Sequence, residues 1–250
     1  MALFKTSNPA LSTKTFDNFT KSFGGDSEVM TLQGAVNKTA ILLGLLMISA
    51  FGMWNLFYSG SQGFLFPLMI FGAIGGLICC IILIFKKEWS PTLAPAYAIL
   101  EGLFVGGISA IYENIFDGIV MQAAMLTFGI LAGLLFLYKS GFIRATENFK
   151  LIVASATMGI AITYLISFIL RLCGIQVPFI HSNGIFGIVF SIICVGIAAA
   201  NLVMDFDFIE EGAEKRAPKY MEWYAAFGLM VTLIWLYIEI LRLLSKLRSR

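Results

Sequence analysis

The stretch GFLFPLMIFGAIGGLICCIILIF at residues 63–85 decides the fold class, because its 23 residues include no charged side chain. An α-helix rises ~1.5 Å per residue, so a run of this length covers the ~30 Å of hydrocarbon in a bilayer. Six further apolar runs of similar length lie at residues 39–58, 91–112, 118–138, 151–170, 184–204 and 223–244. The sequence therefore predicts an all-α polytopic membrane protein with seven transmembrane helices.

The composition indicates a lipid environment for most of the chain. Of the 250 residues, 59% are hydrophobic and 13% are charged, whereas soluble domains carry about 25% charged residues. The first 38 residues are polar and lack the apolar core of a secretory signal. We therefore divide the chain into a polar cytoplasmic tail at residues 1–38 and a transmembrane domain at residues 39–250.

The positions of lysine and arginine predict the orientation, because the cytoplasmic loops of membrane proteins are enriched in both. Twelve of them fall in the tail and in the second, fourth and sixth connections, and five fall at the opposite ends of the runs. This count places the N-terminus in the cytoplasm. The basic C-terminus disagrees with seven crossings, so either the last helix tolerates this charge or it does not cross and both ends are cytoplasmic. We favour seven crossings.

Residues that support catalysis or metal binding are scarce. The only histidine, His181, lies in a loop, and the four cysteines at positions 79, 80, 173 and 194 have no CxxC spacing. The sequence has no GxSxG elbow, no HExxH pair and no P-loop, and it lacks the GxGD context of intramembrane aspartyl proteases. Basic residues do not alternate with aromatic ones, which argues against nucleic-acid binding. We expect no enzyme activity and no cofactor.

Glu101 is the most informative polar residue, because it lies near the middle of the run at residues 91–112. A carboxylate at the centre of a membrane helix costs roughly 2.5–3.5 kcal/mol, so it must be protonated, paired or exposed to a wet cavity. Gly102 beside it leaves room for water or for a neighbouring backbone. The alternative is a neutral carboxyl group that forms a hydrogen bond with another helix.

Three more acidic residues lie at or near the ends of the last two runs. Asp205 and Asp207 are two residues apart, so they point to different helix faces, and both could simply end a helix. Glu239 has Arg242 three residues later on the same face, which indicates an intrahelical ion pair. Thr232, Trp235 and Glu239 fall along one stripe, which could line a cavity.

Glycine pairs with four-residue spacing occur in three of the runs. Small residues on one helix face let two backbones approach closely in lipid, so we interpret these pairs as helix-packing positions. They are Gly72 and Gly76, Gly102 and Gly106, and Gly129 and Gly133.

The chain resembles the Bax inhibitor-like family, also called the transmembrane Bax inhibitor motif family, and is most similar to a bacterial branch. Four stretches carry the resemblance: SNPALS at residues 7–12, MTLQGAVNKT at 30–39, YAILEGLFVGGIS at 97–109, and EWYAAFGL at 222–229 followed by WLYIEILRLL at 235–244. The resemblance implies six helices around a central seventh and a bacterial inner membrane as the location. It also implies a pH-sensitive calcium leak.

In this family, an acidic residue at the end of the sixth helix pairs with one in the seventh and senses protons. The resemblance places the first of these at Asp205, within MDFDFI at residues 204–209, and the second at Thr232, which cannot ionise. The two-carboxyl latch is therefore incomplete, and Glu239, two turns further along, replaces it only if the latch has moved.

The sequence thus leads to two hypotheses about function. The first is a passive, proton-regulated cation pathway, with calcium as the transported ion and Glu101 and Asp205 as oxygen ligands of the kind calcium prefers. The second is an interaction protein that modulates other membrane proteins, such as a membrane protease or a regulator of cell death.

Overall fold

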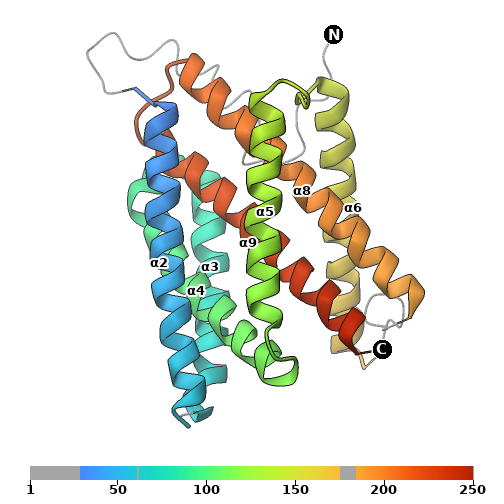
Figure 1. Cartoon of the computed structure of the whole chain (residues 1–250). Coiled ribbons are helices and arrows are strands. Elements are labelled where there is room, and N and C mark those ends of the chain that lie inside the picture. The colour runs from blue at the N-terminus through green and yellow to red at the C-terminus, as the bar shows by residue number, and fades with distance from the viewer. Residues whose placement is uncertain (1–28, 61, 175–183, 250) are drawn as a thin grey trace. The chain divides into compact units, whose positions relative to one another are not determined.

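The computed structural model describes residues 29–60, 62–174 and 184–249, and Figure 1 shows its helices with the labels used below. Seven helices are long and apolar enough to cross a membrane, as the sequence predicts. They are α2 (Leu32–Tyr58), α3 (Leu65–Phe85), α4 (Ser90–Ile115), α5 (Ile119–Lys139), α6 (Glu147–Leu172), α8 (Ile185–Glu214) and α9 (Met221–Arg248). Short 3₁₀ turns at Gln62–Phe64 and Lys87–Trp89 precede α3 and α4. Within the described ranges no strand forms, and Val29 and Pro218 make only an isolated bridge.

Each apolar run maps to one helix, and most of the helices extend beyond their run into polar sequence. Helix α8 continues ten residues past Met204, so Asp205 and Asp207 lie inside it and do not end it. The beginning of α2 is set by Thr31, whose side chain accepts a hydrogen bond from the backbone N–H of Gly34. This is the usual way in which a threonine satisfies a free amide in the first turn of a helix. His181 and the stretch SNPALS lie outside the described residues.

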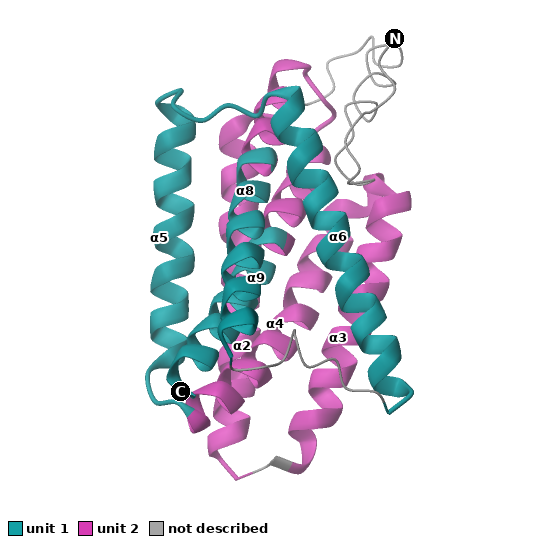
Figure 2. Ribbon diagram, turned by 90° about the vertical axis from the view of Figure 1, so that its right-hand side faces the viewer, with its two compact units in different colours: residues 1–8, 116–204, 232–250 teal, residues 9–115, 205–231 magenta. Residues whose placement is uncertain are grey.

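The chain divides into two compact units, which Figure 2 colours separately. Of the described residues, unit 1 contains 116–174, 184–204 and 232–249, and unit 2 contains 29–60, 62–115 and 205–231. Helices α8 and α9 each contribute to both units, because the boundary falls after Met204 in α8 and after Val231 in α9.

In unit 2, α4 packs against both α2 and α3. Glycines allow the close approach: a Cβ atom at Gly106 would lie 2.5 Å from the carbonyl oxygen of Ala50 on α2. A Cβ atom at Gly72 on α3 would lie 2.4 Å from the carbonyl oxygen of Leu100 on α4. The Oγ of Ser49 also donates a hydrogen bond of 2.6 Å to the carbonyl oxygen of Ile99. The packing interpretation is therefore confirmed for the glycine pairs of α3 and α4.

In unit 1, the third glycine pair does not mediate packing. A Cβ atom at Gly129 or Gly133 on α5 would meet no described atom within 4 Å, so the packing prediction is wrong for this pair. The links that do join helices in this unit are polar. The Nδ2 of Asn201 on α8 donates to the Oγ1 of Thr157 on α6 over 2.8 Å.

Helix α9 is the most buried of the seven spans, since 56% of its most apolar 18-residue window is buried. In unit 2 it contacts α4 through an edge-to-face pair of Phe227 and Tyr97, with ring centroids 4.9 Å apart. In unit 1 it contacts α6 and α8 through the polar groups described below. The central position that the family resemblance implies for the last helix stays a prediction.

Candidate functional site

Glu101 lies in the middle of α4, with eleven helical residues before it and fourteen after it. Its carboxylate packs against α3, because a Cβ atom at Gly76 would lie 2.7 Å from its Oε2. Among the described residues the Glu101 side chain forms no hydrogen bond and no ion pair. Behind it, a Cβ atom at Gly102 would meet the carbonyl oxygen of Leu46 at 2.5 Å. The room that Gly102 provides is therefore taken by the backbone of α2.

Asp205 and Asp207 occupy different environments on α8, as their spacing predicts. Asp205 is 3% exposed, whereas Asp207 is only partly buried. Thr232, the position that corresponds to the second latch carboxyl, is also buried. Asp205 belongs to unit 2 and Thr232 to unit 1, so their pairing stays a prediction.

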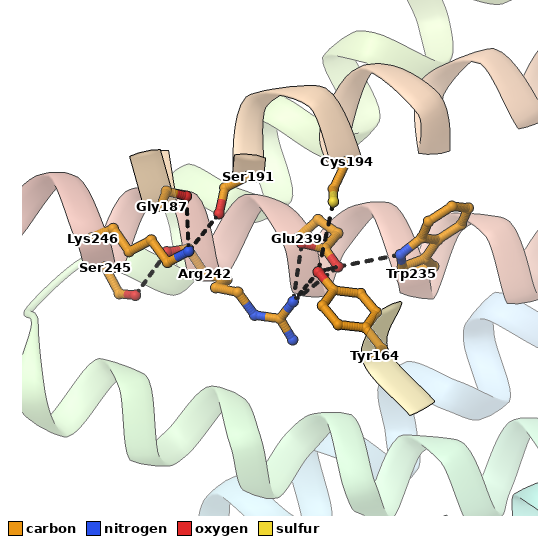
Figure 3. A network of polar contacts seen from close by, with 9 residues as sticks. All are labelled: Tyr164, Gly187, Ser191, Cys194, Trp235, Glu239, Arg242, Ser245 and Lys246. Carbon is orange, nitrogen blue, oxygen red and sulfur yellow. Dashed lines mark hydrogen bonds and ion pairs between the residues drawn. The ribbon is translucent and has the colours of Figure 1, made fainter. Parts of the chain in front are cut away.

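Glu239 is the centre of a charged cluster in unit 1 (Figure 3). The Nη1 of Arg242 lies 3.0 Å from its Oε1 and 3.2 Å from its Oε2, which confirms the predicted ion pair. The Nε1 of Trp235 donates to the same Oε1 over 3.3 Å, so this residue of the predicted stripe does contact Glu239. The Glu239 side chain is 1% exposed, so its carboxylate is stabilised by protein groups and not by solvent.

Tyr164 on α6 joins this cluster from another helix. Its hydroxyl donates a hydrogen bond of 2.8 Å to the Oε1 of Glu239 and accepts one from the Nη1 of Arg242. The guanidinium carbon of Arg242 also lies 5.0 Å from the centre of the Tyr164 ring, within the range of a cation–π contact. The sequence did not reveal Tyr164, because a tyrosine within an apolar run looks like any other core aromatic residue.

Lys246 is a second group that the sequence did not reveal. It is only 4% exposed, and its Nζ donates to the carbonyl oxygen of Gly187 and to the Oγ of Ser191, both at 2.9 Å. These bonds connect the end of α9 with the beginning of α8 (Figure 3). The spacing alone could have placed it beside the Glu239 cluster, because Lys246 follows Arg242 by four residues and so lies on the same helix face.

Glu222 makes a comparable connection in unit 2, where α9 begins. Its Oε1 accepts hydrogen bonds from the backbone N and the Oγ1 of Thr31, both at 3.0 Å, and lies 3.6 Å from the Nζ of Lys219. The fully buried carboxylate rests directly on Gly34, where a Cβ atom would lie 1.9 Å from Oε1. Its Oε2 is buried without a hydrogen bond in the part of the chain that the structure describes.

Hydrogen bonds of the loops that connect the helices establish which helix ends lie together. In unit 2, the backbone N of Met30 donates to the carbonyl oxygen of Ala217 over 2.7 Å, and the Oγ of Ser90 donates to the carbonyl oxygen of Tyr220 over 2.8 Å. The start of α2, the start of α4 and the start of α9 therefore share one end. The basic connections at Lys86–Lys87 and Lys215–Lys219 accompany them, as the orientation argument requires.

The far end of α9 lies beside the connection that follows α4. In unit 1, the Nη1 of Arg248 donates to the carbonyl oxygen of Asp117 over 2.6 Å, two residues after α4 ends. Whether the last helix crosses the membrane stays a prediction.

The described residues contain no group of three or more His, Cys, Asp or Glu side chains that could hold a metal ion. Glu101 and Asp205, the two residues considered as calcium ligands, are therefore not part of a ready-made multidentate site there. The four cysteines are free thiols.

A family model described as Bax inhibitor 1 like matches residues 8–249, which is nearly the whole chain. No curated protein and no solved structure shows significant similarity to it. The match covers all seven spans and the clusters around Glu101, Glu222 and Glu239. The chain therefore belongs to the Bax inhibitor 1-like family of membrane proteins.

Proposed function

We propose that this protein is a passive cation leak of the membrane that is regulated by protons, with calcium as the ion. The observation that carries the proposal is Glu101, a carboxyl group at the middle of a membrane helix with no hydrogen bond or ion pair among the described residues. A group that served only packing would be expected to have a partner, because an unsatisfied polar group in hydrocarbon costs several kcal/mol.

The surroundings of Glu101 agree with a role in ion passage. Gly76 leaves the space on α3 into which the carboxylate projects. Carboxylate oxygens are the ligands that calcium takes most readily, and a lone carboxylate binds it weakly enough to release it again. A leak needs this weak, single-group binding, whereas a cluster of carboxylates would hold the ion.

Proton regulation follows from the chemistry of a carboxyl group in an apolar environment, which disfavours the charged form. The family resemblance assigns the proton-sensing latch to Asp205 and to position 232. Because Thr232 cannot ionise, we expect the flux to depend less steeply on pH than a complete two-carboxyl latch would allow. We place the protein in a bacterial inner membrane with the N-terminus in the cytoplasm, from the resemblance and from the distribution of basic residues.

The test is calcium uptake by liposomes that hold only the purified protein, measured with an internal calcium dye over a series of pH values. A leak gives uptake that depends on the amount of protein and changes with pH. An interaction protein that modulates a partner gives no uptake above that of empty liposomes at any pH. The second result would rule out the leak.

A further inference from the structure

The Glu239 carboxylate is bound on the inside of the protein by a cation that belongs to the chain itself. Glu239 lies nine residues before the last residue of α9, about 14 Å along the helix axis. Its side chain is 1% exposed, and its Oε1 receives hydrogen bonds from Tyr164, Trp235 and Arg242. A permeating cation could reach this carboxylate only if one of these donors moved away.

Arg242 is the donor best placed to move. Its hydrogen bonds with Glu239 and Tyr164 all use Nη1, and the other guanidinium edge, Nε and Nη2, forms no hydrogen bond with the described residues. The Arg242 side chain is 27% exposed, in contrast to 1% for Glu239. Part of the arginine side chain is thus accessible from outside, whereas the carboxylate is not.

Lys246 is anchored to another helix. Its Nζ donates to the carbonyl oxygen of Gly187 and to the Oγ of Ser191 on α8, whereas Arg242 donates directly to the Glu239 carboxylate. With both basic groups in place, this part of unit 1 carries one negative and two positive charges, which repels an approaching cation. Removal of the Arg242 charge alone would leave the carboxylate open.

Tyr164 holds the pair closed from a second helix. A hydroxyl group has one hydrogen, and here it points to the Glu239 carboxylate, because a charged oxygen is a stronger acceptor than the Cys194 sulfur 3.7 Å away. The hydroxyl oxygen is then free to accept from Arg242. One tyrosine on α6 therefore fixes both members of an ion pair on α9.

We infer that Arg242 is a tethered cation that occupies the Glu239 carboxylate in unit 1 and thereby restricts the proposed cation leak, and that Tyr164 is the positioning residue that keeps it there. The inference rests on the proposed leak function and adds its regulation. Ions pass this point when the guanidinium leaves Glu239, which then offers its oxygens to calcium or a similar cation.

The experiment compares calcium uptake by liposomes with wild type, Arg242→Gln, Arg242→Lys and the double variant Glu239→Gln/Arg242→Gln. Arg242→Gln should raise uptake several-fold, and Arg242→Lys, which keeps the charge, should stay near wild type. The double variant should lose the increase, because it has no carboxylate to offer. Arg171→Gln is the matched control, since Arg171 is an exposed arginine at the end of α6 and its replacement removes the same charge.

Two further measurements keep the test informative if Arg242→Gln folds poorly. Tyr164→Phe keeps the ring and removes the hydroxyl, so it should raise uptake less than Arg242→Gln does, while Tyr58→Phe at the exposed end of α2 should have no effect. In a variant without native cysteines, Arg242→Cys should conduct strongly. Its modification with 2-aminoethyl methanethiosulfonate, which restores a positive charge, should lower the uptake again, and neutral methyl methanethiosulfonate should not.

The outcomes separate the inference from the proposed function. Wild-type uptake that Arg242→Gln changes no more than Arg171→Gln would overturn the tethered cation and leave the leak intact. Equal uptake in Arg242→Gln and in the double variant would show that Arg242 does not act through Glu239, and would overturn it as well. No uptake in wild type or in any folded variant would overturn both.

Discussion

The substitution Gly106→Ala should destabilise the protein, because α2 and α4 touch at this glycine. The new Cβ atom would lie 2.5 Å from the carbonyl oxygen and 2.6 Å from the Cα of Ala50. Both are backbone atoms, so the two helices must separate by roughly 1 Å to reach ordinary van der Waals distances. Overpacking of this kind costs ~1–3 kcal/mol. The separation would also stretch the 2.6 Å hydrogen bond from Ser49 to Ile99, which is worth about 0.6 kcal/mol in a membrane protein.

The matched control is Gly129→Ala on α5, where an added Cβ atom meets no described atom within 4 Å. This change should be neutral or slightly stabilising, since alanine is favoured over glycine in a helix by up to ~1 kcal/mol. The assay is the fraction of protein that remains monodisperse in detergent after heating. For a chain of this size each kcal/mol corresponds to ~2–4 °C, so Gly106→Ala should lower the midpoint by about 2–12 °C. A midpoint for Gly106→Ala equal to that of Gly129→Ala would refute the close contact of α2 and α4.

Two other predictions concern the latch and the orientation. If Asp205 is one half of a proton-sensing pair, Thr232→Asp should make the flux depend more steeply on pH, because the state of the latch then depends on the protonation of two carboxyl groups and not of one. An unchanged profile in a folded, conducting variant would place the latch elsewhere. In a background without native cysteines, an impermeant maleimide added to intact cells should label cysteine at position 59 and at position 249 but not at position 214. Labelling of position 214 alone would reverse the orientation, and failure at position 249 would mean that α9 does not cross.

The helices could be predicted from the sequence because the bilayer imposes one length on every span. Each apolar run had to become a helix, since a helix satisfies its own backbone hydrogen bonds in lipid. The pair of Glu239 and Arg242 was also predictable, because three-residue spacing on one helix brings two side chains together.

The rest of the candidate site depends on contacts between distant parts of the chain. Tyr164 is 75 residues from Glu239 in the sequence, and Thr31 is 191 residues from Glu222. A local sequence pattern cannot show that residues so far apart along the chain are in contact. Glycine spacing has the same limit: it identifies one helix face, but it does not say whether another helix covers that face. This is why the expectation held for Gly106 and failed for Gly129.

The measurement that tests the central claim most directly is the calcium flux of Glu101→Gln per folded molecule, beside wild type. Glutamine keeps the shape and the hydrogen-bonding groups of the side chain and removes its charge, so folding should survive. Glu147→Gln serves as the control, because that carboxylate is 77% exposed at the beginning of α6. We predict that flux through Glu101→Gln falls at every pH at which the wild-type group is ionised, while Glu147→Gln conducts like wild type. Equal flux in Glu101→Gln and wild type across the whole pH range would contradict a cation path lined by Glu101.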